Sequence, residues 1–455
     1  MYKKRKRVSQ TLAISLSSLI AVSSFATMNM NYAQAETTSS FNQRTIETSD
    51  QTRDALGLQD ADHQHNTQGT EFKNQYPIVF VHGYNGFVGE NIPSGYPDNY
   101  WGGKRVNVQE NLTQKGYDVH QASVGAYSSN HERAAELYYY LKGGTVDYGA
   151  AHSKKHGHKR FGKTYEGVLK DWKPGQKVHF VGHSMGGQTM RLLEATLRNG
   201  SQEEIEYHKK HGGEMSPLYE GGHNDMVASM QTLVAPHNGS PASDVANNSD
   251  FITRILYDRA KNQNTTQNGA DFGLEHFGLE QREGESYIEY SNRVKDSAIW
   301  TSKDTALYDL TREGAAKINQ QTPINPNVYY RSFAGEASHE GPLGKHRPDM
   351  SMLDSYILSS NIIGETEDKA WRENDGIVST ISEHYPEGQP HEQAQFTDAP
   401  KPGVWQATPT KHDWDHTDFV GRDYKDKNRT SEELETFYTN LAKYTVKVEQ
   451  DMQSK

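Results

Sequence analysis

Short apolar runs that alternate with helical patterns constrain the fold of this 455-residue chain more than any other feature. Six runs rich in β-branched and aromatic residues end at glycine, proline or polar residues, and helical spacing follows several of them. The runs are YPIVFVHGY, YDVHQASV, QKVHFVGH, SMQTLVAP, NVYYRSFAGE and VWQATPT. Because strands that alternate with helices form mainly parallel sheets covered by helices on both faces, the sequence predicts an α/β fold.

The segment from about residue 237 to 326 lacks this alternation. It has the pattern of helices and loops, and no strand is evident in it. An insertion of this size in an α/β protein is commonly a cap over the active site. The sequence therefore predicts a large helical lid insertion at about 237–326, with a packed helical subdomain that does not move as the alternative.

The first 35 residues have the layout of a secretory signal peptide. Five basic residues precede a short apolar run diluted by serine, and the segment ends in Ala-Gln-Ala. The run is too short and too polar for a membrane anchor, which is the alternative. Residues 36–75 are polar and without sustained periodicity, which predicts a linker or a short pro-segment. We therefore expect a secreted, extracellular protein whose folded domain covers residues 76–455.

Composition restricts the partners of such a domain. The chain carries a net charge of −11, and loss of the five basic residues in 1–35 would make it −16. Such a charge disfavours nucleic acid and anionic membrane surfaces, and no stable membrane insertion is expected. The chain has no cysteine. A secreted protein without disulfides must gain rigidity from packing or bound metals, so clusters of His, Asp and Glu are of interest.

The stretch HFVGHSMGGQTMRLLEA, residues 179–195, contains the pattern G-x-S-x-G around Ser184. The pattern alone is weak, because a chain with 39 glycines has a fair chance of containing it. Its flanks add weight, since a strand pattern precedes it and a helical pattern follows it. A serine at such a junction is the nucleophile elbow of α/β-hydrolases, so the sequence predicts an α/β-hydrolase fold with Ser184 as nucleophile.

An α/β-hydrolase also needs oxyanion donors, an acid and a base. The His-Gly turn in VFVHGYNGF and the elbow predict the backbone N–H groups of Tyr84 and Met185 as the donors. Since the acid and the base follow the serine in chain order, Asp375 in ENDGIV is the acid candidate, although an Asp-Gly pair is usually an ordinary turn. His412 and His416 are both candidates for the base, and spacing does not decide between them.

A dense set of acids surrounds these two histidines. Five aspartates fall within fourteen residues, namely Asp413, Asp415, Asp418, Asp423 and Asp426. Such a loop is either solvated or folded around a hard cation, because close carboxylates repel one another unless an ion such as calcium compensates them. A second loop, GAAHSKKHGHKRFG, contains His152, His156 and His158 and by itself is typical of a basic surface loop.

Six separated motifs together resemble the secreted lipases of the staphylococcal family and their thermostable bacillary relatives. They are PIVFVHGYNGF, KGGTVDYGAAHSKKHGH, VGHSMGG, WTSKDTALYDLTREGAAKIN, ENDGIV and WDHTDFVG, and the similarity runs from about Tyr76 to the C-terminus. The resemblance implies a secreted triacylglycerol lipase that acts on lipid at an oil–water interface and has a mobile helical lid. It also implies Ser184 as nucleophile, Asp375 as acid and His416 as base.

The resemblance implies two metal sites as well. A calcium ion beside the catalytic histidine would be held by a distant backbone carbonyl and by Asp415, Asp418, Asp423 and Asp426, which match the family's ligands. Zinc would be held by His152 and His158 and by two residues at positions that are aspartate in the bacillary relatives, here Glu132 and Glu275. Glutamate is one methylene longer than aspartate, so the zinc geometry would differ from that of the relatives.

The same catalytic frame serves other chemistry. A phospholipase A1 or a carboxylesterase would use the same triad, because acyl and head-group preferences depend on pocket walls that a sequence does not position. An acyltransferase or a peptidase would also use it. A binding protein on a hydrolase fold would not need the complete set of Ser, Asp and His. The main prediction is therefore triacylglycerol hydrolysis through an acyl-enzyme, with these activities as alternatives.

Overall fold

The computed structural model describes residues 72–89, 99–170, 172–246 and 302–455, together with parts of 273–300. The predicted signal peptide (1–35) and all but the last four residues of the predicted linker (36–75) lie outside the described residues. So does much of the predicted insertion. No helix in the described part of the chain is long and apolar enough to cross a membrane.

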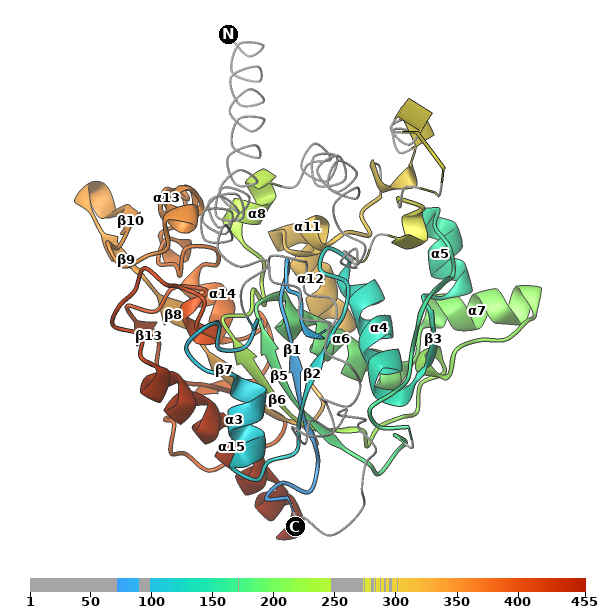
Figure 1. Ribbon diagram of the computed structural model, residues 1–455, viewed down its shortest axis with the longest axis horizontal. Helices are drawn as coiled ribbons and strands as arrows, with labels where there is room; N and C mark the ends of the chain where they lie inside the picture. Colours follow the sequence, from blue (N-terminus) through green and yellow to red (C-terminus); the bar gives the residue numbers. More distant parts are fainter. Residues whose placement is uncertain are drawn as a thin grey trace, which may run out of the picture.

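A seven-stranded sheet forms the centre of the molecule (Figure 1). Its strand order is β11-β12-β7-β6-β5-β1-β2, and every neighbouring pair is parallel. The strands are β1 (Ile78–Val81), β2 (Val119–Ala122), β5 (Val178–His183), β6 (Val227–Leu233), β7 (Tyr329–Phe333), β11 (His391–Gln393) and β12 (Trp405–Ala407). The six predicted runs form six of these strands. The edge strand β11 has no apolar run, since its residues are His-Glu-Gln.

Helices cover both faces of the sheet. One face carries α4 (Asn130–Lys142) and α6 (Met185–Asn199), and the other carries α3 (Val108–Gln114) and α15 (Ser431–Gln453). Side chains of β1 alternate between the two cores, as the pleat of a strand requires. Val79 and Val81 pack on the α4 and α6 side, whereas Ile78 and Phe80 pack on the α3 and α15 side. The predicted α/β fold is confirmed.

The C-terminal helix α15 is capped at its first turn and packs on the sheet through one face. The Thr430 hydroxyl accepts the backbone N–H of Glu433 at 3.1 Å and so caps the first turn. One face of the helix is apolar and buried, and it consists of Leu434, Phe437, Leu441 and Tyr444. This helix closes one face of the sheet.

Smaller elements complete the described chain. The remaining α-helices are α5 (Ala150–His156), α7 (Gln202–His211), α8 (Pro241–Ala246), α11 (Ala306–Asp309), α12 (Arg312–Gln321), α13 (Ile357–Gly364) and α14 (Thr380–His384). Three two-stranded pairs are formed by β3 (Gly144–Asp147) with β4 (Phe161–Tyr165), β9 (Ser338–Glu340) with β10 (His346–Pro348), and β8 (Gly335–Glu336) with β13 (Lys411–His412). Short 3-10 turns are η2 (Pro217–Tyr219), η3 (Glu275–Phe277), η4 (Ala298–Trp300), η5 (Pro342–Gly344), η6 (Asp354–Tyr356), η7 (Lys369–Trp371) and η8 (Asp418–Val420).

The described residues between β6 and β7 are helical or irregular. They contain α8, η3, η4, α11 and α12, and none of the described residues in 237–326 belongs to a strand. The described residues of this insertion therefore have the helical character that the sequence predicts. Its role as a lid stays a prediction.

Candidate active site

Ser184 lies at the tight turn between β5 and α6. Its backbone has φ 53° and ψ −128°, a conformation that residues other than glycine rarely adopt. Neighbouring segments pack very closely here: a Cβ at Gly83 would lie 2.7 Å from Cβ of Ser184, and a Cβ at Gly186 would collide with the carbonyl oxygen of Val81. The strand, turn and helix predicted around Ser184 are all present.

The predicted oxyanion donors belong to two segments that meet at this turn. Met185 is the first residue of α6, where backbone N–H groups have no carbonyl partner within the helix. Tyr84 follows Gly83 in the loop after β1, and the close approach of Gly83 to Ser184 brings this loop to the turn. Both predicted donors therefore belong to segments that border Ser184.

His416 and Asp375 form a buried pair. Nδ1 of His416 lies 2.5 Å from Oδ2 of Asp375. The other oxygen, Oδ1, accepts the backbone N–H groups of Ile377 at 2.9 Å and Val378 at 2.7 Å. The backbone N–H of His416 also donates to the carbonyl oxygen of Asp375 at 2.9 Å. The Asp-Gly turn thus holds the carboxylate in place against the imidazole.

The alternative base, His412, lies elsewhere. Its side chain is 74% exposed, and its Nδ1 is 2.8 Å from Oε2 of Glu336. This contact raises the pKa of His412 above its usual value. The structure therefore brings His416, and not His412, to Asp375.

A chain of hydrogen bonds joins the loop after β1 to the loop of His416. The N–H of Gly83 donates to the Tyr100 hydroxyl at 2.8 Å, which lies 2.6 Å from Nδ1 of His183. Nε2 of His183 lies 2.9 Å from the carbonyl oxygen of His416. Because a carbonyl can only accept, Nε2 carries the hydrogen and Nδ1 accepts from Tyr100. Burial holds the pKa of His183 well below its usual value, which keeps the ring neutral.

Three acids next to His416, which we call the aspartate group, are Asp415, Asp418 and Asp423. One carboxylate oxygen from each lies within 4.8 Å of the others. Burial and the repulsion of neighbouring carboxylates raise the pKa of Asp415 well above its usual value. Burial raises the pKa of Asp418 to about 8. Oδ1 of Asp418 and Oδ2 of Asp423 are buried without a hydrogen-bond donor, which fits a hard cation that takes oxygen ligands.

Asp426, the fourth predicted calcium ligand, lies beside the aspartate group without belonging to it. Its Oδ2 accepts from Nε of Arg429 at 3.1 Å, and its Oδ1 accepts the N–H of Asn428 at 2.7 Å. Its own N–H donates to Oδ1 of Asp423 at 3.3 Å. The structure therefore brings three of the four predicted ligands together and pairs the fourth with an arginine.

A second cluster, which we call the histidine group, consists of Glu132, His152, His158 and Asp304, whose ligand atoms lie within 4.8 Å of one another. Nε2 of His152 and of His158 lie 2.7 Å and 3.3 Å from Oδ2 of Asp304. Burial raises the pKa of Glu132 well above its usual value. Burial acts to raise the pKa of Asp304 too, but attraction by the histidines outweighs it and holds this pKa well below its usual value. Mixed imidazole and carboxylate donors fit a divalent metal that accepts both.

Asp304 occupies the place in this group that was predicted for Glu275, and the structure does not bring Glu275 into the group. Glu275 begins η3 and is partly exposed, while the next residue of this turn, His276, directs its Nε2 at Oε1 of Glu132. Asp304 precedes α11 and is buried. The turn of η3 thus presents a histidine to the group, and the loop before α11 supplies the second acid.

Comparison with known proteins identifies the family of this chain. A family model described as the lipase-like C-terminal domain matches residues 74–455. The chain belongs to this lipase family. A lipase of Staphylococcus epidermidis is 52% identical over 380 residues, which are 84% of this chain and 55% of the relative. Lipase 1 of Staphylococcus aureus is 53% identical over 380 residues, which are 83% of this chain and 55% of the relative. The chain thus spans about half the length of these curated relatives.

A solved structure gives the same assignment. The crystal structure of Staphylococcus hyicus lipase matches with a TM-score of 0.79 and 51% identity, over 84% of this chain and 97% of that chain. The resemblance to staphylococcal lipases is therefore confirmed. The parallel sheet is that of an α/β-hydrolase.

Two buried side chains support the site of this lipase-family chain, and neither follows from a sequence motif. The guanidinium of Arg133 on α4 donates to the carbonyls of His82 and Gly125, which anchors the loop that carries Tyr84. Glu383 accepts the backbone N–H of Gly335 at 2.7 Å, and burial together with repulsion by Asp375 raises the pKa of Glu383 well above its usual value. Only contacts across the fold identify these two residues.

Proposed function

We propose that the protein is a secreted triacylglycerol lipase in which Ser184, His416 and Asp375 form a catalytic triad. The observation that carries this proposal is the buried 2.5 Å contact between Nδ1 of His416 and Oδ2 of Asp375. The strained turn at Ser184 and the lipase names of the relatives support it.

The mechanism follows from the roles of these groups. His416 takes the hydroxyl proton of Ser184 while the serine oxygen attacks the ester carbonyl, and Asp375 holds the imidazole tautomer and stabilises the imidazolium. The N–H groups of Tyr84 and Met185 bind the negative oxygen of the tetrahedral intermediate. Collapse of the intermediate breaks the ester bond, and the leaving alcohol takes the proton from His416. Water then attacks the acyl-enzyme by the same route and releases the fatty acid.

Two structural metals belong to the proposal. Calcium bound by the aspartate group would neutralise its carboxylates, and Asp415, Asp418 and Asp423 would then keep the loop of His416 in one conformation. Zinc bound by the histidine group would take two nitrogen and two oxygen ligands, and these residues would connect α4 and α5 to the loop before α11. In both sites the residues present serve structure, and the triad performs the chemistry.

Substitution of the nucleophile tests the triad. Ser184→Ala should leave a folded protein whose rate on emulsified triolein falls by roughly 10³-fold or more, because the acyl-enzyme cannot form. Ser454→Ala, at the exposed end of α15, is a matched control and should retain the wild-type rate. Near-normal turnover by Ser184→Ala would contradict the triad.

Substrate comparison tests the lipase assignment. Rates of the wild-type protein on triolein, tributyrin and phosphatidylcholine should be highest on the triacylglycerols. A higher rate on phosphatidylcholine would favour a phospholipase A1, and activity confined to tributyrin would favour a carboxylesterase.

A further inference from the structure

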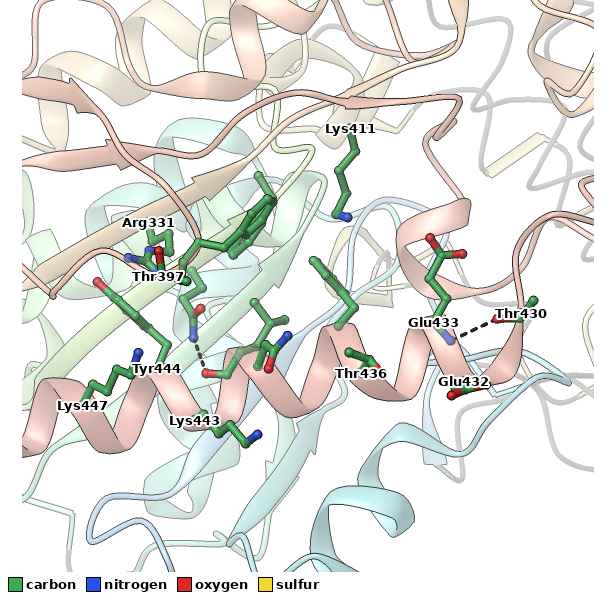
Figure 2. A pocket seen from close by; sticks show the side chains of 16 residues that line it. Arg331, Thr397, Lys411, Thr430, Glu432, Glu433, Thr436, Lys443, Tyr444 and Lys447 are labelled. Carbon is green, nitrogen blue, oxygen red and sulfur yellow. Dashed lines mark hydrogen bonds between the residues drawn. The ribbon is translucent and has the colours of Figure 1, made fainter.

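A pocket of about 640 Å³ lies on the face of the sheet that α15 covers (Figure 2). Its walls come from β6, β7, the loop after β11, β13 and the N-terminal two thirds of α15. None of the proposed catalytic residues or metal ligands lines it. The volume falls within the range of ligand sites, roughly 300–1,000 Å³. The mechanism above gives this pocket no role.

Arg331 brings a buried positive charge to the pocket. Arg331 lies on β7 and is only 3% exposed. Its guanidinium lies 3.8 Å from the ring centroid of Tyr444. It donates to the carbonyl oxygens of Phe396 at 3.3 Å and Asp398 at 3.1 Å, and its Nε has no hydrogen-bond partner. The carboxylate of Asp398 instead accepts the N–H of Gln395. Arg331 therefore forms no ion pair with any described residue.

Lys411 brings a second poorly solvated charge. Its ammonium nitrogen lies 4.3 Å, 5.4 Å and 5.3 Å from the ring centroids of Trp414, Phe396 and Phe437. Burial lowers the pKa of Lys411, as it does that of Arg331. No described carboxylate lies within ion-pair distance of this lysine. Buried charges in proteins are usually paired, so two unpaired cations at one pocket point to an anionic ligand.

Basic residues outnumber acidic residues around the pocket. Lys443 and Lys447 of α15 line it as well, while its acids are Glu432 and Glu433. Glu433 already accepts from Arg429 at 3.0 Å. The lining thus has more basic than acidic groups, in a chain whose net charge is −11. A local cationic surface on an acidic protein favours an anion specifically at this place.

The rest of the lining suits a hydrocarbon chain. Phe333, Phe396, Phe437 and Leu441 contribute apolar surface, and Phe396 is 45% exposed although it is a large aromatic residue. A ligand that covered these side chains would gain roughly 25 cal/mol for each Å² of apolar surface removed from water. The pocket therefore combines a place for an anion with a place for an apolar body.

We propose that this pocket binds a long-chain fatty acid as its carboxylate, with the head group at Lys411 and the chain along Phe333, Phe396 and Phe437. Arg331 lies on the other side of the pocket and adds to its positive charge (Figure 2). The ligand class rests on the proposed function, because ester hydrolysis by Ser184 would release such acids. The pocket would then hold a reaction product at a site separate from the triad.

The test uses the full-length protein with its acyl site at Ser184 blocked. An alkylphosphonate p-nitrophenyl ester is allowed to react with the protein, mass spectrometry reports the adduct, and calorimetry measures binding of sodium laurate below its micelle concentration. We expect one laurate site on the adduct. Lys411→Met should weaken binding at least tenfold, and Lys411→Arg should preserve it within about threefold. Lys401→Met is the matched control, because Lys401 is 59% exposed, pairs with Glu392 and does not line the pocket.

Each outcome supports or overturns the proposal. Acetate, inorganic phosphate and dodecyltrimethylammonium are titrated in parallel, and tighter binding of laurate than of all three supports it. Equal binding of acetate or phosphate would mean a small-anion site, and equal binding of the cationic surfactant would mean that charge has no part; both overturn it. Absence of the phosphonate adduct counts against the proposed triad instead, and in that case the dependence of laurate binding on Lys411 is measured on the unmodified protein.

Discussion

The aspartate group and the histidine group differ in how the chain assembles them. Asp415, Asp418 and Asp423 come from one short loop and offer only oxygen atoms. The histidine group takes its residues from α4, α5, the loop after α5 and the loop before α11, and it offers both nitrogen and oxygen. A metal in the first group would fix a single loop, which carries His416. A metal in the second would tie part of the helical insertion to the rest of the fold. Loss of the first should therefore reduce catalysis, and loss of the second should mainly reduce stability.

Of the effects that distinguish the two groups, the largest is expected on activity when the aspartate group loses its metal. Asp423→Asn should lower kcat on tributyrin about 10- to 100-fold, as losses around metal ligands typically do, and EGTA should have the same effect on the wild type. The matched control is Asp413→Asn: this aspartate lies in the same loop, has φ 61° and is not a member of the group, and asparagine tolerates that backbone. If both variants retained full activity, the loop would not depend on a cation.

Loss of a ligand from the histidine group should lower the affinity for zinc and the thermal stability of the protein. Asp304→Asn should weaken zinc binding about 10- to 100-fold and lower Tm, with kcat at 25 °C changed much less than in Asp423→Asn. Glu275→Gln is the matched control and should bind zinc like the wild type. Zinc titration and thermal melts measure the difference. A larger loss in Glu275→Gln than in Asp304→Asn would restore the ligand set expected from the resemblance.

Some features of the fold and the site could be predicted from the sequence and others could not, for a physical reason. Strands and the turn at Ser184 depend on local patterns, so β1, β5 and α6 could be predicted from short stretches of sequence. β11 could not, since an edge strand of polar residues needs only a partner strand. Asp304 lay inside a motif that carried the resemblance, but no spacing rule connects it with Glu132, 172 positions earlier. Spacing likewise left His412 and His416 open, and only the resemblance favoured His416, because the contact of His416 with Asp375 joins residues 41 positions apart.

The aspartate group should also make the stability of the protein depend on pH. Without a metal, the pKa of Asp418 is about 8, against 3.8 for an ordinary aspartate, and that of Asp415 is also raised. Between these values the folded state binds more protons than the unfolded state, so the stability of the metal-free protein falls as the pH rises. Calcium bound to this group would remove the loss, because it would stabilise the ionised carboxylates. The Tm difference between protein in calcium and protein in EGTA should therefore widen by several degrees from pH 5 to pH 8. A constant difference would contradict the assignment of the cation to this group.

The smallest expected effect concerns the hydrogen bonds that hold the loop of His416 independently of any metal. Tyr100→Phe removes the hydroxyl between Gly83 and His183, and leaves a buried donor and a buried acceptor without a partner, at a cost of about 1–3 kcal/mol. With calcium bound, the aspartate group should still hold the loop, so kcat should fall only a few-fold. In EGTA the fall should be larger, because both supports are then lost, whereas zinc chelation should not enlarge it. Tyr140→Phe, which loses a hydrogen bond to the carbonyl of Gln121 far along the chain from the triad, controls for the loss of one hydroxyl. An equal effect of Tyr100→Phe with and without calcium would mean that the two supports act on different parts of the site.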